Sequence, residues 1–187
     1  AVGYSWGICE EVGKSVRLLE MFGLPGIKNL NDYFDKKKKQ KFENLKLINA
    51  ENKFIKLQYC PIISGTSLLD QIKSLNNLNE IKFEGIAYPL LFLPFVSRAS
   101  EIIGKRLLLK LDSNEFLLNF NNNIFSNFIN NEIIIIANIV TIRLLENTDS
   151  FSEKEWNQLY KLSEETFVEE SDSLKETAAG AGLIDND

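Results

Sequence analysis

The sequence has no histidine in its 187 residues. This absence excludes Ser-His-Asp and Cys-His catalysis, histidine-ligated metals and imidazole proton shuttles. An enzyme made from this chain would therefore use carboxylates, lysine, arginine, tyrosine, serine, cysteine or backbone groups, or would borrow a cofactor. We expect no metal ion and no other bound cofactor.

Cysteine is scarce, with only Cys9 and Cys60 in the chain. The two residues lie far apart in the sequence and lack the close spacing of a zinc or redox pair. Free cysteines are usually buried. We therefore interpret both residues as reduced thiols in the core.

Long hydrophobic runs are also absent: no apolar stretch reaches the roughly 18 residues that span a membrane, and no secretory signal is visible. Acidic residues outnumber basic ones by 26 to 21, which gives a formal net charge of -5. A nucleic-acid groove usually needs a basic excess. These features predict a cytoplasmic protein that binds neither nucleic acid nor a membrane.

Helical patterns recur along the chain. The apolar stripe of residues 5–22 begins at Trp6, and Gly13 inside it predicts a close packing neighbour, since glycine costs a helix about 1 kcal/mol relative to alanine. A capping box at Ser152–Glu155 predicts a last helix whose stripe begins at Trp156. We therefore expect both tryptophans to be largely buried. The other helical segments are expected at residues 24–47, with an interruption, and at 68–75 and 97–104.

Strand patterns fill the middle of the chain. Strands are expected at residues 53–59, 80–85 and 87–95, in a hairpin of 105–111 with 116–120, and at 132–145, a β-branched run suited to the centre of a sheet. The chain is thus predicted to form a single α+β domain, a mainly antiparallel sheet of about five strands packed against helices. Residues 168–187 are expected to form a tail that docks on the body.

A charged face on the first expected helix is one candidate site. Paired carboxylates beside a lysine do acid-base work when burial separates their pKa values. Glu10 or Glu11 would then be the catalytic base, with Lys14 beside them, and Arg17 and Arg98 would bind an anionic substrate. The alternatives are an ordinary solvated helix face and, for Arg98, an ion pair with a structural glutamate.

A run of basic residues, Lys36-Lys37-Lys38-Lys39-Gln40-Lys41, is a second candidate. It could bind phosphate groups or a membrane. It could equally be a solvated helix face, which we favour because no second basic cluster supports anion binding.

The two ends of the chain resemble a known family. The opening reads Gly3-Tyr4-Ser5-Trp6-Gly7-Ile8-Cys9-Glu10-Glu11-Val12-Gly13-Lys14, followed by Gly23-Leu24-Pro25-Gly26. This pattern, and the ending Gly180–Asp187, resemble the bacterial family known as domain of unknown function 3726. Cys9 departs from the alanine usual there, and Leu174-Lys175 from an expected Ser-Arg pair. The resemblance implies that Trp6, Glu10, Glu11 and the terminal segment with Asp185 belong to one surface, with Trp6 and Asp185 among the substrate-binding residues.

Three functions are consistent with these patterns, one of them a purely structural subunit of an oligomer with the terminal segment as a clasp. The leading hypothesis is a cytosolic binding or accessory protein of small-molecule metabolism, which takes a small anionic metabolite and docks to an enzyme partner or to a second copy of itself. The alternative is a cofactor-independent lyase or isomerase with a glutamate base. The enzyme predicts a pocket walled by the first helix, whereas the accessory protein predicts an exposed apolar patch near the chain ends.

Overall fold

The computed structural model describes residues 3–54, 56–119, 121, 123–129, 132–146 and 150–166. The chain divides into two compact units, residues 1–147 and 148–187. Each unit is described by itself, and the expectation of a single domain stays a prediction. The predicted docking tail, residues 168–187, lies outside the described residues.

The first unit is built on a six-stranded sheet, which confirms the predicted α+β class. Its strands run in the order β1-β2-β6-β3-β4-β5. Among the described strands, β1 and β2 pair in parallel and all other neighbours are antiparallel. The predicted hairpin is present as β3 and β4, and the β-branched strand β6 is central, between β2 and β3. In chain order the strands are β1 (Glu51–Asn52), β2 (Glu80–Ala87), β3 (Arg106–Leu111), β4 (Asn114–Leu118), β5 (Ile124–Ser126) and β6 (Ile136–Leu145).

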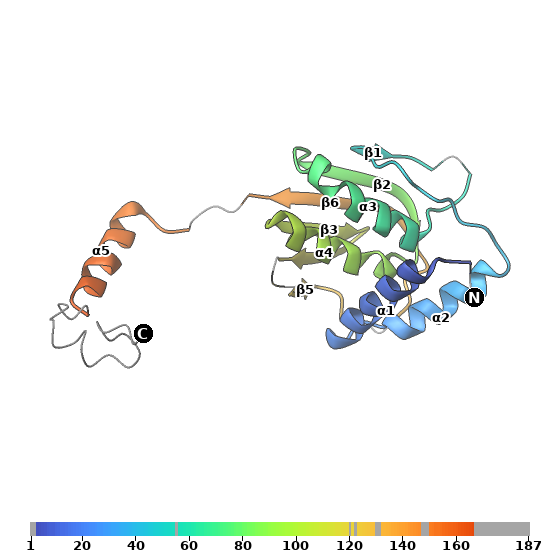
Figure 1. Ribbon diagram of the computed structural model, residues 1–187, viewed down its shortest axis with the longest axis horizontal. Helices are drawn as coiled ribbons and strands as arrows, with labels where there is room; N and C mark the ends of the chain where they lie inside the picture. Colours follow the sequence, from blue (N-terminus) through green and yellow to red (C-terminus); the bar gives the residue numbers. More distant parts are fainter. Residues whose placement is uncertain are drawn as a thin grey trace, which may run out of the picture. The chain divides into compact units, whose positions relative to one another are not determined.

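Helices cover one face of this sheet. They are α1 (Trp6–Met21), α2 (Gly26–Lys37), α3 (Pro61–Leu75) and α4 (Leu93–Ile103). In Figure 1, α3 and α4 lie over the strands, α1 packs against α3 and α4, and α2 packs beside α1. The strands turn alternate apolar residues toward the helices, so that Phe83 pairs with Val140 and Ile142 pairs with Leu109 in the core.

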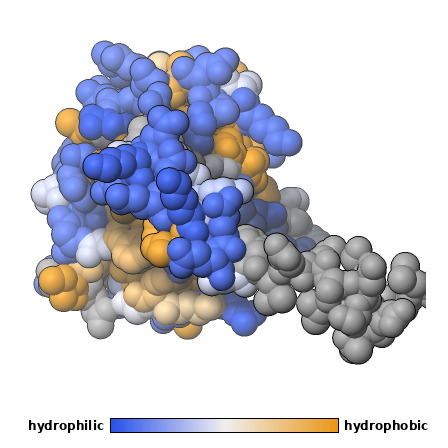
Figure 2. Space-filling model, turned by 90° about the vertical axis from the view of Figure 1, so that its left-hand side faces the viewer, coloured by the Kyte–Doolittle hydropathy of each residue, from blue (hydrophilic) through white to orange (hydrophobic). Residues whose placement is uncertain are grey.

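The opposite face of the sheet carries charged pairs and scattered apolar residues. Arg143 donates to Glu80 across β6 and β2 at 2.9 Å, and Lys110 lies 2.5 Å from Glu115. Ile139, between the charged groups, is 47% exposed. The side of the molecule that Figure 2 displays likewise mixes hydrophilic and hydrophobic residues.

Several predicted boundaries are wrong. Residues 87–95 are not a strand: Tyr88 adopts a left-handed conformation, Pro89–Leu91 form a 3-10 turn, and α4 starts at Leu93 with Pro94 in its first turn. An apolar run of this length fits a buried strand or a buried helix equally well. Proline at the start of a helix also explains why α3 begins at Pro61, earlier than predicted. The strand expected at 53–59 is wrong: β1 ends before it, at Asn52, and the described residues of 53–59 form only an isolated bridge at Tyr59.

The orientation of α1 differs from the predicted stripe. Trp6 is 81% exposed and Cys9 is also exposed, so the predicted burial of both residues is wrong. The later members of the predicted stripe, Val12, Val16 and Leu19, do face the core, and Ile8 joins them in place of Trp6 and Cys9. Residues four apart share a helix face, so a stripe starting at Ile8 satisfies the helical period as well as one starting at Trp6 does.

The second unit contains helix α5 (Glu153–Glu164). Its predicted capping box is confirmed: Glu155 N–H donates to Ser152 Oγ at 3.3 Å, and Ser152 N–H donates to the Glu155 carboxylate at 2.7 Å. The Ser152 hydroxyl also donates to the Glu155 carboxylate, at 2.6 Å. This bond first, and then the bond from Ser152 N–H, lower the pKa of Glu155. Trp156 stacks on Phe151 but is 53% exposed, so its predicted burial is wrong within the described residues.

None of the described helices combines the length and the apolar content that crossing a bilayer requires.

Glycine allows two close helix contacts, at positions other than the one predicted. A Cβ on Gly65 of α3 would lie 2.3 Å from the Phe95 ring on α4, and one on Gly26 of α2 would lie 2.9 Å from Leu19 on α1. A Cβ on Gly13 would meet no described atom within 4 Å outside the backbone of its own helix. The prediction of a close packing neighbour for Gly13 is therefore wrong.

Replacing Gly65 by alanine should destabilise the first unit by about 1–3 kcal/mol, because the added methyl group forces α3 and the buried Phe95 apart. Gly13→Ala, also within a helix, should instead stabilise the protein by up to about 1 kcal/mol through helix propensity. Urea unfolding of both variants measures this difference. A Gly65→Ala protein as stable as the parent would contradict the close contact.

Candidate functional site

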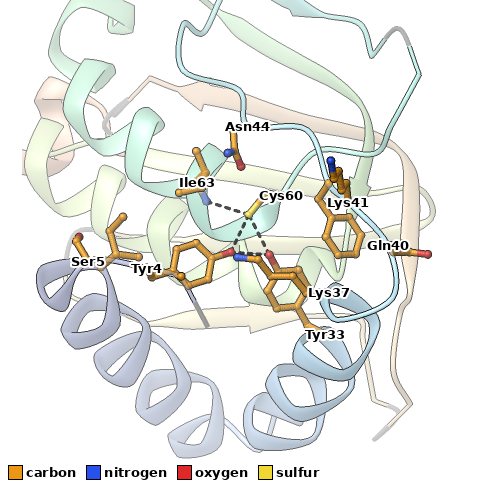
Figure 3. Close-up of a pocket in the computed structure, with 12 residues that line it drawn as sticks. Tyr4, Ser5, Tyr33, Lys37, Gln40, Lys41, Asn44, Cys60 and Ile63 are labelled. Atoms are coloured by element: carbon orange, nitrogen blue, oxygen red, sulfur yellow. Dashed lines mark hydrogen bonds between the residues drawn. The ribbon is translucent and has the colours of Figure 1, made fainter. Parts of the chain in front are cut away.

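A cavity of about 410 Å³ opens where the start of α1, the end of α2 and the start of α3 meet (Figure 3). We call it the Lys37 cavity. It is lined by Gly3, Tyr4, Ser5, Ile8, Tyr33, Lys37, Gln40, Lys41, Phe42, Asn44, Cys60 and Ile63.

The most buried part of the cavity is a triangle of polar groups, which we call the Tyr-Tyr-Cys triangle. The hydroxyls of Tyr4 and Tyr33 lie 2.6 Å apart. Cys60 Sγ lies 3.2 Å from the first hydroxyl and 3.1 Å from the second. Tyr33 is fully buried and Cys60 is 1% exposed. Tyr4 is partly exposed. The three groups therefore satisfy one another, two of them away from water.

The three residues of the triangle come from different parts of the helix layer. Tyr4 immediately precedes the N-cap of α1, and Tyr33 lies on the buried face of α2. Cys60 is the N-cap of α3 and accepts a 3.5 Å hydrogen bond from Ile63 N–H. Its own N–H donates to Glu43 O at 2.8 Å. The start of α3 is thus fixed against the loop that follows α2.

Aromatic packing holds Tyr33 in place. Its ring centroid lies 5.2 Å from that of Phe42 and 5.6 Å, edge to face, from that of Tyr88. Tyr88 in turn donates to Asp32 at 2.5 Å. Burial raises the pKa of Tyr88, and the bond to Asp32 adds to this effect. The tyrosine at the centre of the site therefore has little freedom to turn.

Both tyrosines of the triangle stay protonated at neutral pH. Burial is the largest cause that raises the pKa of Tyr4 and of Tyr33, and the neighbouring Cys60 raises both further. Each hydroxyl, like the thiol, has one hydrogen to donate and a lone pair to accept with. A ring in which each group donates once and accepts once satisfies all three.

Two lysines give the cavity a positive character. Lys37 Nζ lies 3.4 Å from the centroid of the Tyr4 ring, and Lys41 lines the same cavity. Burial lowers the pKa of Lys37, against a smaller opposite effect of Cys60. The lining includes no carboxylate, and within the described part of the chain neither lysine forms an ion pair.

The lysine run is not one helix face, but its lysines other than Lys37 are exposed, as the favoured interpretation predicts. Helix α2 ends at Lys37, and the chain then turns so that Lys37, Gln40 and Lys41 line the cavity. Lys38, by contrast, pairs with Asp35 at the surface, at 2.8 Å. The run divides between the cavity and the solvent because the helix stops inside it.

A second cavity, of about 270 Å³, brings together several predicted site residues. We call it the Glu11 cavity; it lies between α1 and α4 and includes Glu11, Lys14 and Arg98. Glu11 contacts Arg98 and lies 3.1 Å from Lys14, which is also 2.9 Å from Glu10. These carboxylates raise the pKa of Lys14, Glu10 first. Each cation is already matched to a carboxylate.

The remaining predicted site residues are not in this cavity. Trp6 and Arg17 are exposed and do not line it, and Asp185 lies outside the described residues. The roles of all these residues in catalysis or binding stay predictions. Within the described residues no group of three or more aspartate, glutamate or cysteine side chains could hold a metal ion.

Sequence reasoning did not select Tyr33 or Cys60 as site residues, whereas Lys37 and Lys41 belong to the lysine run that it considered for anion binding. One local signal was available, because Cys60 directly precedes Pro61 and proline favours the first turn of a helix. That signal predicts a helix start with a thiol at the N-cap. Nothing in the sequence places this thiol beside Tyr4 and Tyr33, which lie 56 and 27 positions away.

The raised pKa values of Tyr4 and Tyr33 predict a loss of stability at high pH. The folded state holds these protons more tightly than the unfolded chain does, so their contribution is complete below about pH 10 and declines as the pH rises further. Tyr33→Phe should make this alkaline decline shallower, whereas Tyr160→Phe on α5 should not. Unfolding free energies followed from neutral to alkaline pH test this, and equal slopes for parent and Tyr33→Phe would contradict it.

Glu11→Gln should cost at most about 1 kcal/mol of stability, because its ion pairs are partly exposed to solvent. The cost should shrink as salt is added. Urea unfolding at low and high salt measures it. A salt-independent loss of several kcal/mol would show that Glu11 does more than pair with Lys14 and Arg98.

Comparison with known proteins gives one match. The model of the family "Protein of unknown function (DUF3726)" matches residues 1–56, and neither the curated proteins nor the solved structures gave a match. The matched region includes Tyr4, Tyr33 and Lys37, and stops before Cys60. The predicted terminal motif lies outside the match. The match confirms the resemblance predicted from the opening motif: residues 1–56 of this chain are similar to DUF3726.

Proposed function

We propose that this protein binds a small anionic molecule in the Lys37 cavity. The observation that carries the proposal is the pairing of two lysines, without any carboxylate, around a cavity of about 410 Å³. Small-molecule sites commonly occupy about 300–1,000 Å³ and combine apolar walls with a few convergent polar groups.

The electrostatics of Lys37 favour an anionic ligand. Burial lowers the pKa of Lys37, which means that the ammonium has lost part of its hydration, and its described contact is the face of the Tyr4 ring. An anion that enters the cavity replaces the lost hydration and stabilises the charged form. Lysine suits phosphate and carboxylate groups as a compact point charge.

The other lining residues indicate the chemistry of the rest of the ligand. Tyr4, Ile8, Phe42 and Ile63 present apolar surface, while Gln40 and Asn44 offer amide groups. A ligand with a phosphate or carboxylate on a small, flat, partly apolar body fits this lining. The two cysteines form no disulfide in the described chain, which is typical of reducing compartments, and we include a cytoplasmic location in the proposal.

The lyase or isomerase alternative depends on the Glu11 cavity and is less well supported. There Lys14 and Arg98 already contact Glu10 and Glu11, so an anionic substrate would have to displace an existing ion pair. In the Lys37 cavity no such displacement is needed. Docking to an enzyme partner or to a second copy stays a prediction.

Phenyl phosphate and inorganic phosphate are suitable probes. A ligand present at about 100 times its dissociation constant stabilises a protein by about 2.7 kcal/mol, which should raise the melting temperature by roughly 5–10 °C. Lys37→Gln and Lys41→Gln should each weaken the affinity for phenyl phosphate by about tenfold. Lys39→Gln is the matched control, since Lys39 belongs to the same run but does not line the cavity.

Calorimetric titration of the four proteins gives the affinities. Binding that is equal in parent, Lys37→Gln and Lys41→Gln would place the anion elsewhere. Absence of binding by both phosphates and by a panel of carboxylates would reject the proposal.

A further inference from the structure

We propose that Cys60 is a nucleophile toward small electrophiles that carry an anionic group and bind in the Lys37 cavity. This inference rests on the proposed function and adds the chemical class of the ligand. It comes from the position of the sulfur, which lines the cavity together with Lys37 and Lys41.

Three groups that can donate hydrogen bonds surround the sulfur. The hydroxyls of Tyr33 and Tyr4 lie 3.1 and 3.2 Å away, and Ile63 N–H points to it at 3.5 Å. Figure 3 shows these contacts converging on Cys60 from the residue before the N-cap of α1, from α2 and from α3. As a thiol reacts it passes through a state with negative charge on sulfur, and donors already aimed at the atom stabilise that charge without rearranging.

The surroundings of the triangle reinforce this effect. Cys60 caps α3, a helix of 15 residues, and the positive end of a helix dipole favours negative charge at that point. Lys37, above the Tyr4 ring, adds a full positive charge nearby. Reactive cysteines in enzymes lie in such electropositive settings, whereas purely structural ones are enclosed by apolar groups.

The triangle also offers a route for the thiol proton. The three distances fit a resting ring in which the thiol donates to one tyrosine hydroxyl, that hydroxyl donates to the other, and the second donates back to sulfur. When the S–H proton leaves, both hydroxyls can turn to donate to the sulfur. Tyr4 is the partly exposed member, so the proton reaches solvent on its side of the ring.

The reaction is a substitution at carbon or at sulfur. The Sγ lone pair forms a bond to the electrophilic atom, the bond to the leaving group breaks, and the leaving group departs with that electron pair. The thiol proton passes to solvent, so no oxidant or reductant is required. A disulfide of a small acidic thiol and an alkylating carboxylate both belong to this class.

The alternative role for Cys60 is structural, as a buried helix cap. Its 1% exposure agrees with that role in the resting cavity, where Lys37 lies over the adjoining Tyr4 ring. An anion that pairs with Lys37 would draw the ammonium away from the ring and open the approach to sulfur. The two roles therefore differ in how Cys60 responds to the charge of the reagent.

The test compares iodoacetate, which is anionic, with neutral iodoacetamide. It uses the full chain with Cys9→Ser, because Cys9 is exposed and would react first. Peptide mass spectrometry follows alkylation of Cys60 in the folded protein and in urea. The ratio of the iodoacetate rate to the iodoacetamide rate should be about tenfold higher in the folded protein than in urea. Adding Lys37→Gln should remove most of this preference, Lys39→Gln should leave it intact, and phenyl phosphate should slow the reaction.

A folded protein in which Cys60 reacts no faster than the chain unfolds, or reacts without preference for the anionic reagent, would overturn the inference. Phenyl phosphate binding is measured in parallel on Cys60→Ser, which retains the cavity lysines. If Cys60→Ser binds phenyl phosphate but Cys60 is inert in the parent, the nucleophile is wrong and the binding function stands. If neither reaction nor binding occurs, both fail.

Discussion

The contact among Tyr4, Tyr33 and Cys60 is the constraint on which the rest of the first unit depends. It joins the starts of two helices and the middle of a third, from positions far apart in the chain. A hydroxyl left without a partner in this buried setting would cost about 1–3 kcal/mol. A slip of α2 along its axis would break two of the three contacts at once, so the triangle selects one register of the helices and, with it, one position for Lys37.

Besides the polar contacts at their ends, the helices pack tightly where they cross. Gly26 lets α2 approach Leu19 of α1, and Gly65 lets α3 approach Phe95 of α4. The helices thus meet closely along their lengths but diverge where Tyr4, Lys37 and Cys60 stand, and the Lys37 cavity occupies the space between their ends. The cavity is therefore a product of the helix layer, while the sheet serves as its support.

Sequence patterns predicted the α+β class, the hairpin, the central strand and the first and last helices, because each has a local signal such as alternation, a turn or a capping box. They placed Trp6 in the core wrongly, since helical spacing alone does not fix which of two adjacent stripes faces inward. The Glu11, Lys14 and Arg98 group could be foreseen in part because two of its members share one helix. The Tyr-Tyr-Cys triangle could not, since it exists only after α2 and α3 have packed.

The two outermost strands of the sheet are its shortest described ones, β1 with two residues and β5 with three. An edge strand exposes unpaired backbone groups that can recruit a strand from another molecule, and length makes that recruitment stronger. Here the long, β-branched strand β6 is enclosed between β2 and β3, and the borders present only a few peptide groups each. Strand β6, the segment best suited to pair with another strand, is thus kept away from neighbouring molecules. The sheet therefore resists growth by strand addition even though one of its faces is open.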